Sequence, residues 1–264
     1  MINLKTDEEI EILRENNLLV SKTLAEVGKH IKPEITTLEL DKIAEKFIRD
    51  NGAEPGFLGY NGFPNTLCIS VNSVVVHGIP SNYRLQEGDI VSIDCGTRMK
   101  GFYGDSAYTF AVGKISAEAE KLLKVTKESL YKGIEQINSN ARIGDISNAI
   151  QTHAEKYGYS VVRELIGHGI GRNMHEKPNV PNYGKKGNGA KLQNGMVICI
   201  EPMINSGKRN IYIEDDGWTV RTCDNKYSAH FELAVAIRNK GKADVLSTFK
   251  FIEEQLGYAE YNSN

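Results

Sequence analysis

Asp89-Ile-Val-Ser-Ile-Asp94 and Phe102-Tyr-Gly-Asp105-Ser-Ala-Tyr-Thr-Phe110 both have the pattern of β-strands, and Met99-Lys100-Gly101 between them suits a hairpin turn. With the turn centred on its first two residues, Asp94 and Asp105 would face each other. Directly opposed side chains have Cβ atoms about 4.5–5.5 Å apart, so two carboxylates would repel unless cations lay between them. Two metal ions about 3.5–4 Å apart would fit that gap. The alternative is a solvated hairpin face with two unrelated aspartates.

The composition narrows the class of protein. The chain has 264 residues, of which 40% are hydrophobic and 25% charged, as in ordinary globular proteins. A net charge of −2 and a pI near 6.3 give no electrostatic footprint for nucleic acid or an anionic membrane. No apolar run approaches the roughly 20 residues that cross a bilayer. The length suits one pseudo-symmetric domain, and we expect residues 1–264 to form a single domain.

The N-terminus and the cysteines indicate the cell compartment. The first residues lack the basic start and apolar stretch of a signal peptide, so we expect a cytoplasmic location. The cysteines show no CxxC pairing, and no arrangement of Cys, His and Asn for nucleophilic catalysis is evident. We therefore expect reduced thiols at Cys68, Cys95, Cys199 and Cys223.

Helical and extended segments follow the same order twice along the chain. Apolar positions predict a helix over 6–31, and the capping-box pattern of Thr36 and Glu39 opens a second helix. Two more helices and an extended segment are predicted at 116–137, 145–157 and 159–163. This order predicts an α+β protein whose two halves share one core, with a site between them.

Two histidine motifs differ in specificity. His77 ends the apolar run Val74-Val-Val-His77 before a turn marked by Gly and Pro, where a hydrogen-bonded structural histidine is the more common case. The segment from Ile166 to Pro178 is more informative, because it places His168 and His175 in glycine-rich chain that a ligand can approach closely. It lacks the third glycine offset of a dinucleotide-binding fingerprint.

Two glutamates lie at the ends of apolar strands. Glu201 closes Ile198-Cys-Ile-Glu-Pro-Met203, and Glu232 precedes the apolar run that follows it. A buried carboxylate is costly unless its charge meets a cation or strong donors. A structural ion pair with Arg or Lys would explain either one alone. The set formed with Asp94, Asp105 and His168 instead matches an oxygen-rich dinuclear metal site.

Together these motifs resemble type I methionine aminopeptidases, the short cytoplasmic members of the pita-bread metallopeptidases, over nearly the whole chain. The resemblance implies two pseudo-symmetric halves with a curved antiparallel sheet covered by helices, in one catalytic domain. It also implies two divalent ions, of cobalt, manganese or iron, held by Asp94, Asp105, His168, Glu201 and Glu232. Such ligation suits these ions without naming the native one.

The resemblance also implies a mechanism. A water that bridges two cations would attack the first peptide bond and pass its proton to a carboxylate, for which Glu201 is the candidate. His77 and His175 would line the site and hydrogen-bond the substrate backbone and the developing oxyanion. The substrates would be peptides and nascent chains with an N-terminal methionine. A monomer is expected from the resemblance alone, and a ribosome contact stays open.

Selectivity for methionine calls for a pocket with soft or aromatic walls. By resemblance, the pocket would be shaped by Phe57, Tyr60, Phe63, Cys68 and Trp218, which otherwise would be ordinary core residues. The chain departs from common members at two positions. Gly96 stands where many members carry a hydroxyl, and Phe57 stands where a cysteine is frequent. These departures concern the shape of the pocket and not the reaction.

Two other functions compete with this one. Proline-specific aminopeptidases and dipeptidases use the same kind of five-ligand site, but usually carry an additional N-terminal domain, for which the early first helix leaves no room. A metal-free binding protein could use the same scaffold, because a fold does not by itself imply catalysis. The presence of all five ligand positions argues against that alternative.

Overall fold

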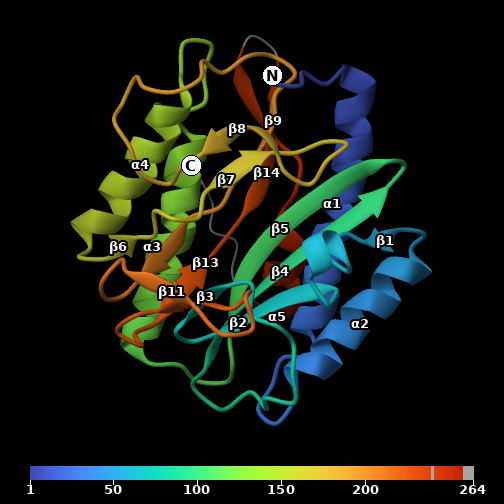
Figure 1. Ribbon diagram of the computed structural model, residues 1–264, viewed down its shortest axis with the longest axis vertical. Helices are drawn as coiled ribbons and strands as arrows, with labels where there is room; N and C mark the ends of the chain where they lie inside the picture. Colours follow the sequence, from blue (N-terminus) through green and yellow to red (C-terminus); the bar gives the residue numbers. More distant parts are fainter. Residues whose placement is uncertain (239–240, 258–264) are drawn as a thin grey trace.

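Two pairs of helices flank the strands of the molecule. The structure is a computed structural model that describes residues 1–238 and 241–257. Helices α1 (Asp7–Gly28) and α2 (Thr37–Asp50) lie on one side, and α3 (Ala117–Ile134) and α4 (Ile143–Lys156) lie on the other (Figure 1). A short helix, α5 (Lys250–Leu256), packs against α1. None of the described helices combines the length and apolar character needed to cross a membrane.

The helix starts follow from capping. Thr36 accepts a hydrogen bond from the backbone N–H of Glu39, whose carboxylate accepts one from the N–H of Thr36, so the predicted capping box is confirmed. Thr6 caps α1 in the same way. Helix α4 begins earlier than predicted, because Asp145 accepts from the N–H of Arg142 and therefore lies inside the first turn.

Short antiparallel strands fill the space between the helices. The central strands β4 (Ile90–Met99) and β5 (Phe102–Ala111) form a hairpin, with β1 and β2 along the other edge of β4. A second sheet has the order β15-β14-β9-β7-β8, and two smaller ones have the orders β13-β10-β6 and β11-β12-β3. The other strands are β1 (Glu54–Pro55), β2 (Leu67–Val71), β3 (Val74–Val76), β6 (Ser160–Val161), β7 (Gly167–Gly169), β8 (Glu176–Val180), β9 (Val197–Ile200), β10 (Met203–Asn205), β11 (Ile211–Ile213), β12 (Val220–Thr222), β13 (Ser228–His230), β14 (Leu233–Arg238) and β15 (Lys242–Val245).

The predicted register of the hairpin was wrong by two residues. Asp94 pairs with Ala107, and Asp105 pairs with Gly96, so the two aspartates are diagonal neighbours rather than opposed ones. The two-residue turn is Lys100-Gly101, with φ of 52° and 79°. Both values are positive, which is the type I′ geometry that a glycine favours and that matches strand twist. Because side chains alternate with a period of two, Asp94 and Asp105 still share one face of the hairpin.

Hydrogen bonds tie the hairpin to the second sheet. The N–H of Glu232, just before β14, donates to the carbonyl of Ala107 at 2.9 Å, and the hydroxyl of Ser106 donates to the carbonyl of Glu232 at 2.6 Å. One buried apolar cluster includes residues of α1 to α4 and of both sheets. The side chains of the hairpin and of the second sheet therefore meet at the centre of the fold.

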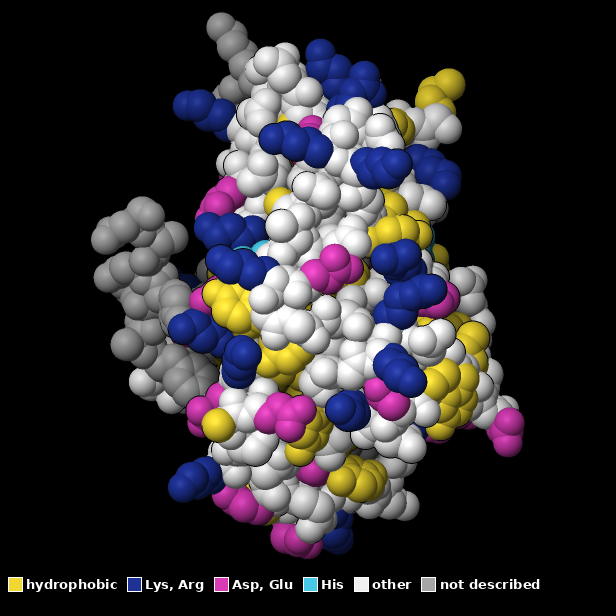
Figure 2. All heavy atoms as spheres, turned by 90° about the vertical axis from the view of Figure 1, so that its left-hand side faces the viewer, with side chains coloured by type: hydrophobic (Ala, Val, Ile, Leu, Met, Phe, Trp, Pro, Cys, Tyr) yellow, Lys and Arg dark blue, Asp and Glu magenta, His cyan; other side chains and the backbone are white. Residues whose placement is uncertain are grey.

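The surface carries mixed charge. On the face seen in Figure 2, Lys and Arg side chains lie among Asp and Glu side chains. This agrees with the small net charge of −2.

Candidate metal centre

All five predicted ligands come together between the two halves. Asp94 and Asp105 come from the hairpin, His168 from β7, Glu201 from the end of β9 and Glu232 from the start of β14. His168 Nε2 lies 3.9 Å from Asp105 Oδ2 and 3.6 Å from Glu201 Oε1. The carboxyl groups of Asp94 and Asp105 are in hydrogen-bond contact. The hydrogen bond from Asn182 Nδ2 to the carbonyl of Glu201, 3.0 Å long, holds the backbone there.

The tautomer of His168 leaves one nitrogen available to a cation. Its Nδ1 lies 2.9 Å from the carbonyl oxygen of Gly169, which can only accept, so Nδ1 carries the proton. The Nε2 lone pair then points toward the carboxylates. A hydrogen bond from the other ring nitrogen to a carbonyl commonly orients histidines that bind metals. Burial, followed by the proximity of His175, lowers the pKa of His168 to about 4, so the ring is neutral at neutral pH.

The carboxylates lack the partners that buried charges require. Asp94 Oδ1, Asp105 Oδ1 and Glu232 Oε1 are buried and have no hydrogen-bond partner among the described residues. A buried carboxylate without a partner costs several kcal/mol, so such atoms call for an ion or a proton. The donor set of four carboxylates and one imidazole fits divalent cations of the Mn²⁺, Fe²⁺ or Co²⁺ type.

Crowding shifts the protonation of these groups. Burial raises the pKa of Asp105 well above its usual range, and repulsion from Glu232, Asp94 and Glu201 raises it further. Burial and the same kind of repulsion raise the pKa of Glu201 and Glu232. Burial also raises the pKa of Asp94, although His230 and a hydrogen bond from Asp105 act in the opposite direction. Without cations, burial and mutual repulsion therefore favour the protonated forms of these carboxyl groups.

A cysteine that the sequence did not point to lies beside the ligands. The donor atoms of Asp105, His168, Glu232 and Cys199 all lie within 4.8 Å of one another. Burial, then repulsion from Glu232 and Asp105, raises the pKa of Cys199 well above its usual range, so the thiol is neutral. The neutral thiol lies beside the carboxylate of Glu232 and lowers its pKa, against the larger effect of burial, which raises it. All four cysteines are free, as predicted.

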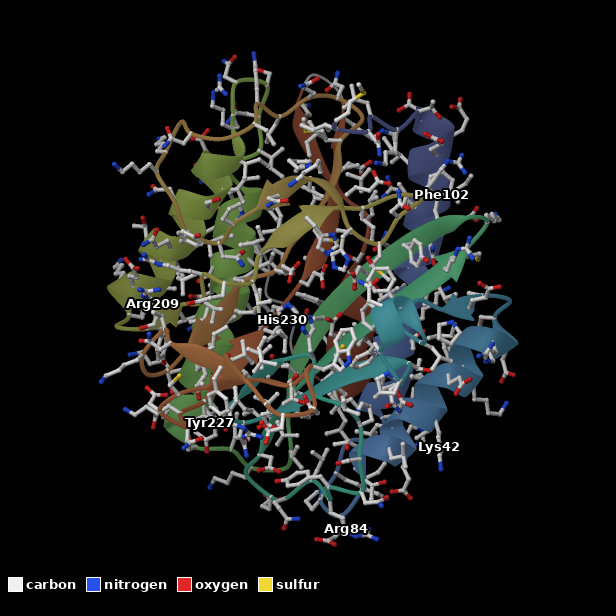
Figure 3. The ribbon with its side chains drawn as sticks, in the orientation of Figure 1. Lys42, Arg84, Phe102, Arg209, Tyr227 and His230 are labelled. Carbon is white, nitrogen blue, oxygen red and sulfur yellow. The ribbon has the colours of Figure 1, made fainter. Side chains whose placement is uncertain are left out.

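His230 is a second residue beside the ligands that the sequence did not predict. It lies in the middle of the molecule (Figure 3), is 1% exposed, and its Nε2 has no hydrogen-bond partner among the described residues. That nitrogen is 3.7 Å from Glu201 Oε2. Strand alternation could have found both missed residues, because positions two apart share a face: Cys199 precedes Glu201 by two, and His230 precedes Glu232 by two.

The two predicted non-ligand histidines border the centre. The His175 ring lies 4.3 Å from the His168 ring, centroid to centroid, and its Nδ1 is 2.8 Å from the hydroxyl of Tyr60. His77 has a φ of 58°, unusual for a residue with a side chain. Burial, followed by His230 and His175, lowers its pKa to about 4. Burial also lowers the pKa of His175. Both rings are therefore neutral hydrogen-bonding groups at neutral pH.

The residues expected to form the methionine pocket lie in one apolar group, here termed the aromatic cluster: Phe57, Tyr60, Phe63, Cys68 and Trp218, with Met174 packed among them. The Phe63 and Trp218 rings meet edge to face at 5.2 Å, and Trp218 faces His77 at 6.4 Å. Cys68 pairs in register with Asp94, so its side chain lies on the face of the sheet that carries the metal ligands.

A match to a known family settles what kind of protein has this centre. The family model described as metallopeptidase family M24 matches residues 11–239. The chain belongs to metallopeptidase family M24. A methionine aminopeptidase of Clostridium perfringens is 52% identical over 95% of this chain and 100% of its own length. Methionine aminopeptidase 1 of Bacillus subtilis is 51% identical over 91% of this chain and 97% of its own length.

A solved structure agrees with this M24 assignment. The methionine aminopeptidase of Rickettsia prowazekii superposes with a TM-score of 0.92 at 40% identity, over 94% of this chain and 100% of that one. The resemblance drawn from the sequence is therefore confirmed, and so is the α+β pita-bread fold.

Within the M24 fold, the two departures from the common pattern explain each other. A Cβ at position 96 would lie 2.5 Å from Phe57 Cε1 and 2.9 Å from Met174 Cε, both too close. The N–H of Gly56 donates to the carbonyl of Gly96 at 2.7 Å, which fixes the Phe57 loop on β4. Since Gly96 pairs with Asp105, the Phe57 ring occupies the space that a side chain at 96 would fill beside the metal ligands.

The variant G96A is expected to weaken binding of a methionine substrate by roughly tenfold in KM, because the ring must move toward the substrate. In F57A/G96A the methyl group has room, so part of that loss should be recovered, with a coupling of about 0.5–3 kcal/mol between the sites. Steady-state kinetics on Met-Ala-Ser with G96A, F57A and F57A/G96A completes the double-mutant cycle. G28A is a matched control, since its Cβ would lie 2.9 Å from Phe110 Cε1 in the core. If the free-energy effects of the two single substitutions simply added in the double variant, the contact between position 96 and the Phe57 ring would be contradicted.

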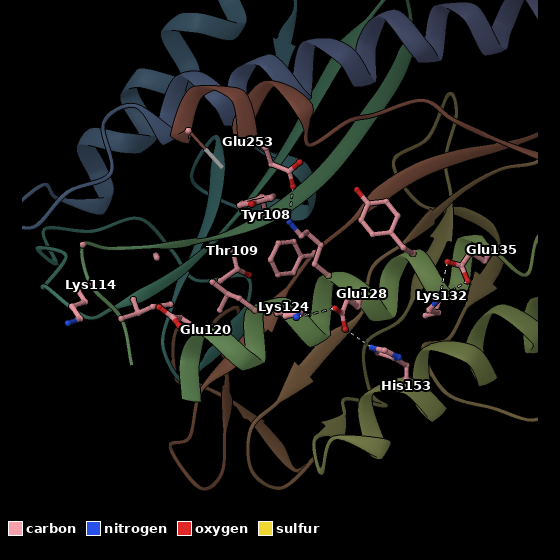
Figure 4. A pocket seen from close by; sticks show the side chains of 18 residues that line it. Tyr108, Thr109, Lys114, Glu120, Lys124, Glu128, Lys132, Glu135, His153 and Glu253 are labelled. Carbon is pink, nitrogen blue, oxygen red and sulfur yellow. Dashed lines mark hydrogen bonds and ion pairs between the residues drawn. The ribbon is translucent and has the colours of Figure 1, made fainter. Parts of the chain in front are cut away.

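A separate pocket of about 920 Å³ opens between α3 and α5 (Figure 4). It contains none of the predicted site residues. Several of its charged side chains pair with one another, as in Lys127–Glu253, Lys132–Glu135 and His153–Glu128. These ion pairs satisfy charged side chains along the lining of the groove.

Proposed function

We propose that the chain removes the N-terminal methionine from peptides and nascent proteins by hydrolysing the first peptide bond. The observation that carries this is the position of the aromatic cluster directly beside a buried centre of four carboxylates and one imidazole. Membership of family M24 supports a metal-dependent aminopeptidase, and the relatives at about 50% identity are named methionine aminopeptidases.

The residues that would hold the cations are Asp94, Asp105, His168, Glu201 and Glu232. Their unpartnered buried oxygens and the free Nε2 of His168 are the atoms suited to this role. Divalent cations bound there would lower the pKa of a water and polarise the scissile carbonyl. The other steps depend on side chains of the chain itself.

Glu201 is proposed as the base that takes the proton of the attacking water. Its carboxylate lies beside His168, with Oε1 3.6 Å from His168 Nε2, so it borders the position where a cation and its water would bind. Proton transfer is most efficient when the pKa of the base lies near the working pH. The protonated Glu201 can then deliver that proton to the amide nitrogen of the second residue, which becomes the new amine of the shortened peptide as the C–N bond breaks. His230, 3.7 Å from the other carboxylate oxygen, limits the orientations that Glu201 can adopt.

His175 and His77 are proposed to bind the reacting carbonyl and the substrate backbone. When the Tyr60 hydroxyl donates to His175 Nδ1, the Nε2–H of His175 is free to donate to a developing oxyanion. His77 is held against Trp218, so it would border the methionine side chain as well as the peptide. A neutral ring can donate one hydrogen bond without adding positive charge to a site built for cations.

Several finer points belong to the same proposal. Two ions of cobalt, manganese or iron would occupy the centre, and the protein would act as a cytoplasmic monomer on chains as they are made, with a contact to the ribosome as one way to meet them. Residues 1–264 would act as one catalytic domain.

The test adds Mn²⁺ or Co²⁺ to metal-stripped protein and follows the release of the first residue from Met-Ala-Ser and Ala-Pro-Ala. Release of methionine alone, lost in D94A and E201A, is the expected result. Cleavage before proline would reassign the chain to a proline-specific peptidase. Binding of metal without hydrolysis of either peptide would reassign it to a binding protein.

A further inference from the structure

The N-terminal arm, residues 2–5, lies against the loop that carries His168 and His175. Lys5 Nζ is 2.5 Å from Glu176 Oε2, and the two side chains are only 5% and 4% exposed. Asn3 Nδ2 donates to the same oxygen at 3.2 Å, and Lys5 Nζ also donates to the carbonyl of Asn3 at 2.9 Å. The backbone N–H of Lys5 donates to the carbonyl of Gly195 at 2.7 Å, just before β9. The arm therefore bridges the loop and the second sheet.

The other oxygen of Glu176 holds the loop itself. Glu176 Oε1 accepts from the backbone N–H of Asn173 at 3.2 Å, which closes a tight turn around His175. Burial disfavours ionisation, but the hydrogen bonds from Lys5 and Asn173 outweigh it and lower the pKa of Glu176. The carboxylate is therefore charged at neutral pH and connects Lys5 to the backbone on both sides of His175.

The loop has a glycine where the ion pair needs space. A Cβ at position 171 would lie 2.5 Å from Lys5 Cε and 2.7 Å from Glu176 Oε1, so a side chain there would displace both partners. A buried ion pair adds little net stability, because the loss of hydration offsets the attraction. It does fix geometry. The pair adjoins His175, the residue whose ring must be aimed at the reacting carbonyl.

We infer that Lys5 is a positioning residue, which acts through Glu176 to hold the His175 imidazole in its place beside the metal centre. Lys5 contacts none of the five candidate ligands in the hydrogen bonds and ion pairs of the described residues. On the other side, the His175 ring is held by the Tyr60 hydroxyl. The ring is thus fixed from two directions, by Tyr60 at Nδ1 and by the arm through the neighbouring residue. The inference rests on the proposed function of His175.

The test compares K5M, E176Q and K5M/E176Q on Met-Ala-Ser. Because an oxyanion contact is made in the transition state, kcat should fall with KM little changed. The expected loss is about tenfold to 10²-fold, since a misplacement of about 1 Å can cost 10²-fold. All three variants break the same connection between Lys5 and the turn around His175. The kcat of the double variant should therefore fall no further than that of the worse single variant. Multiplied losses would overturn the link through Glu176.

K46M is the matched control, because it breaks an exposed ion pair, Lys46–Asp50, with side chains 76% and 59% exposed. If K5M fails to fold because the buried Glu176 carboxylate has lost its partner, K5M/E176Q tests the same connection without that unpaired charge. Activity is expressed per titrated active site, so a merely less stable protein keeps its kcat. A kcat within twofold of the parent in the folded variants would overturn the inference.

A second readout does not depend on activity. NMR of protein with ¹³C-labelled histidine should show shifted or broadened ring signals for His175 in K5M, with those of His30 unchanged on the surface. Unchanged His175 signals would overturn the inference even if the enzyme were slower. An inactive parent would instead refute the proposed function, while the NMR comparison would still test whether Lys5 positions His175.

Discussion

Replacing Glu201 with glutamine is expected to lower kcat for Met-Ala-Ser by about 10²–10⁴-fold, the range that a positioned general base supplies. The amide has the shape of the carboxyl group but cannot take a proton from water. It also removes one negative charge from a centre whose other carboxylates repel one another. Steady-state assays at saturating Mn²⁺ measure the change in kcat. Calorimetry of Mn²⁺ binding separates a loss of metal affinity from a loss of proton transfer.

The control for this change is E45Q. Glu45 pairs with Arg49 on the exposed face of α2, with side chains 37% and 51% exposed, and should leave kcat within twofold. If E201Q, fully loaded with metal, kept a kcat within tenfold of the parent, another group would have to be the base.

Removing the metal should make stability depend steeply on pH. The folded pKa values of Asp94, Asp105, Glu201 and Glu232 are raised above their unfolded values of about 3.9–4.3. Between the unfolded and the folded pKa, the folded state binds more protons than the unfolded one, so stability is lost as the pH rises. Each such group contributes about 1.4 kcal/mol per pH unit while it titrates in the folded state.

The useful window lies above about pH 6.5, the pKa of an unfolded histidine, where Asp105, Glu201 and Glu232, whose pKa values are raised well above their usual range, still make stability fall as the pH rises. Below it, the histidines with lowered pKa values, such as His77 and His168 at about 4, make stability fall with decreasing pH and would mask the effect. Urea unfolding of the metal-stripped protein across this window should show a falling free energy, and Mn²⁺ should flatten the curve. D105N should reduce the slope of the metal-free curve. Equal slopes with and without metal would contradict the prediction.

The five candidate ligands could be proposed from the sequence because Glu201 and Glu232 adjoin apolar strands, where a buried carboxylate is costly, and because Asp94 and Asp105 lie in the two strands of one hairpin. The predicted proximity of the two aspartates does not depend on the exact register of the hairpin. Side chains alternate with a period of two, so a register shift of two positions keeps Asp94 and Asp105 on one face. The shift itself depended on Lys100 accepting a positive φ, which propensities do not favour.

Other features depend on contacts between distant segments and could not be read from local patterns. The pairing of Lys5 with Glu176 spans most of the chain, and no periodicity links the two positions. The Phe57 contact with position 96 joins a loop to a strand through one missing Cβ. Helix α5 was not predicted, because its seven residues follow Phe249, which supplies no side-chain cap.

The contact between Phe57 and position 96 favours one order of substitution at these two positions. With a phenylalanine at 57, every other residue at 96 brings a Cβ to 2.5 Å from the ring, so a side chain with a hydroxyl there requires the ring to move. Once residue 57 has become small, the two nearest contacts of a Cβ at 96 are removed, and the flexible end of Met174 remains at 2.9 Å. The two-step path from this chain to one with a small residue at 57 and a hydroxyl at 96 is therefore less hindered when the loop changes before the strand.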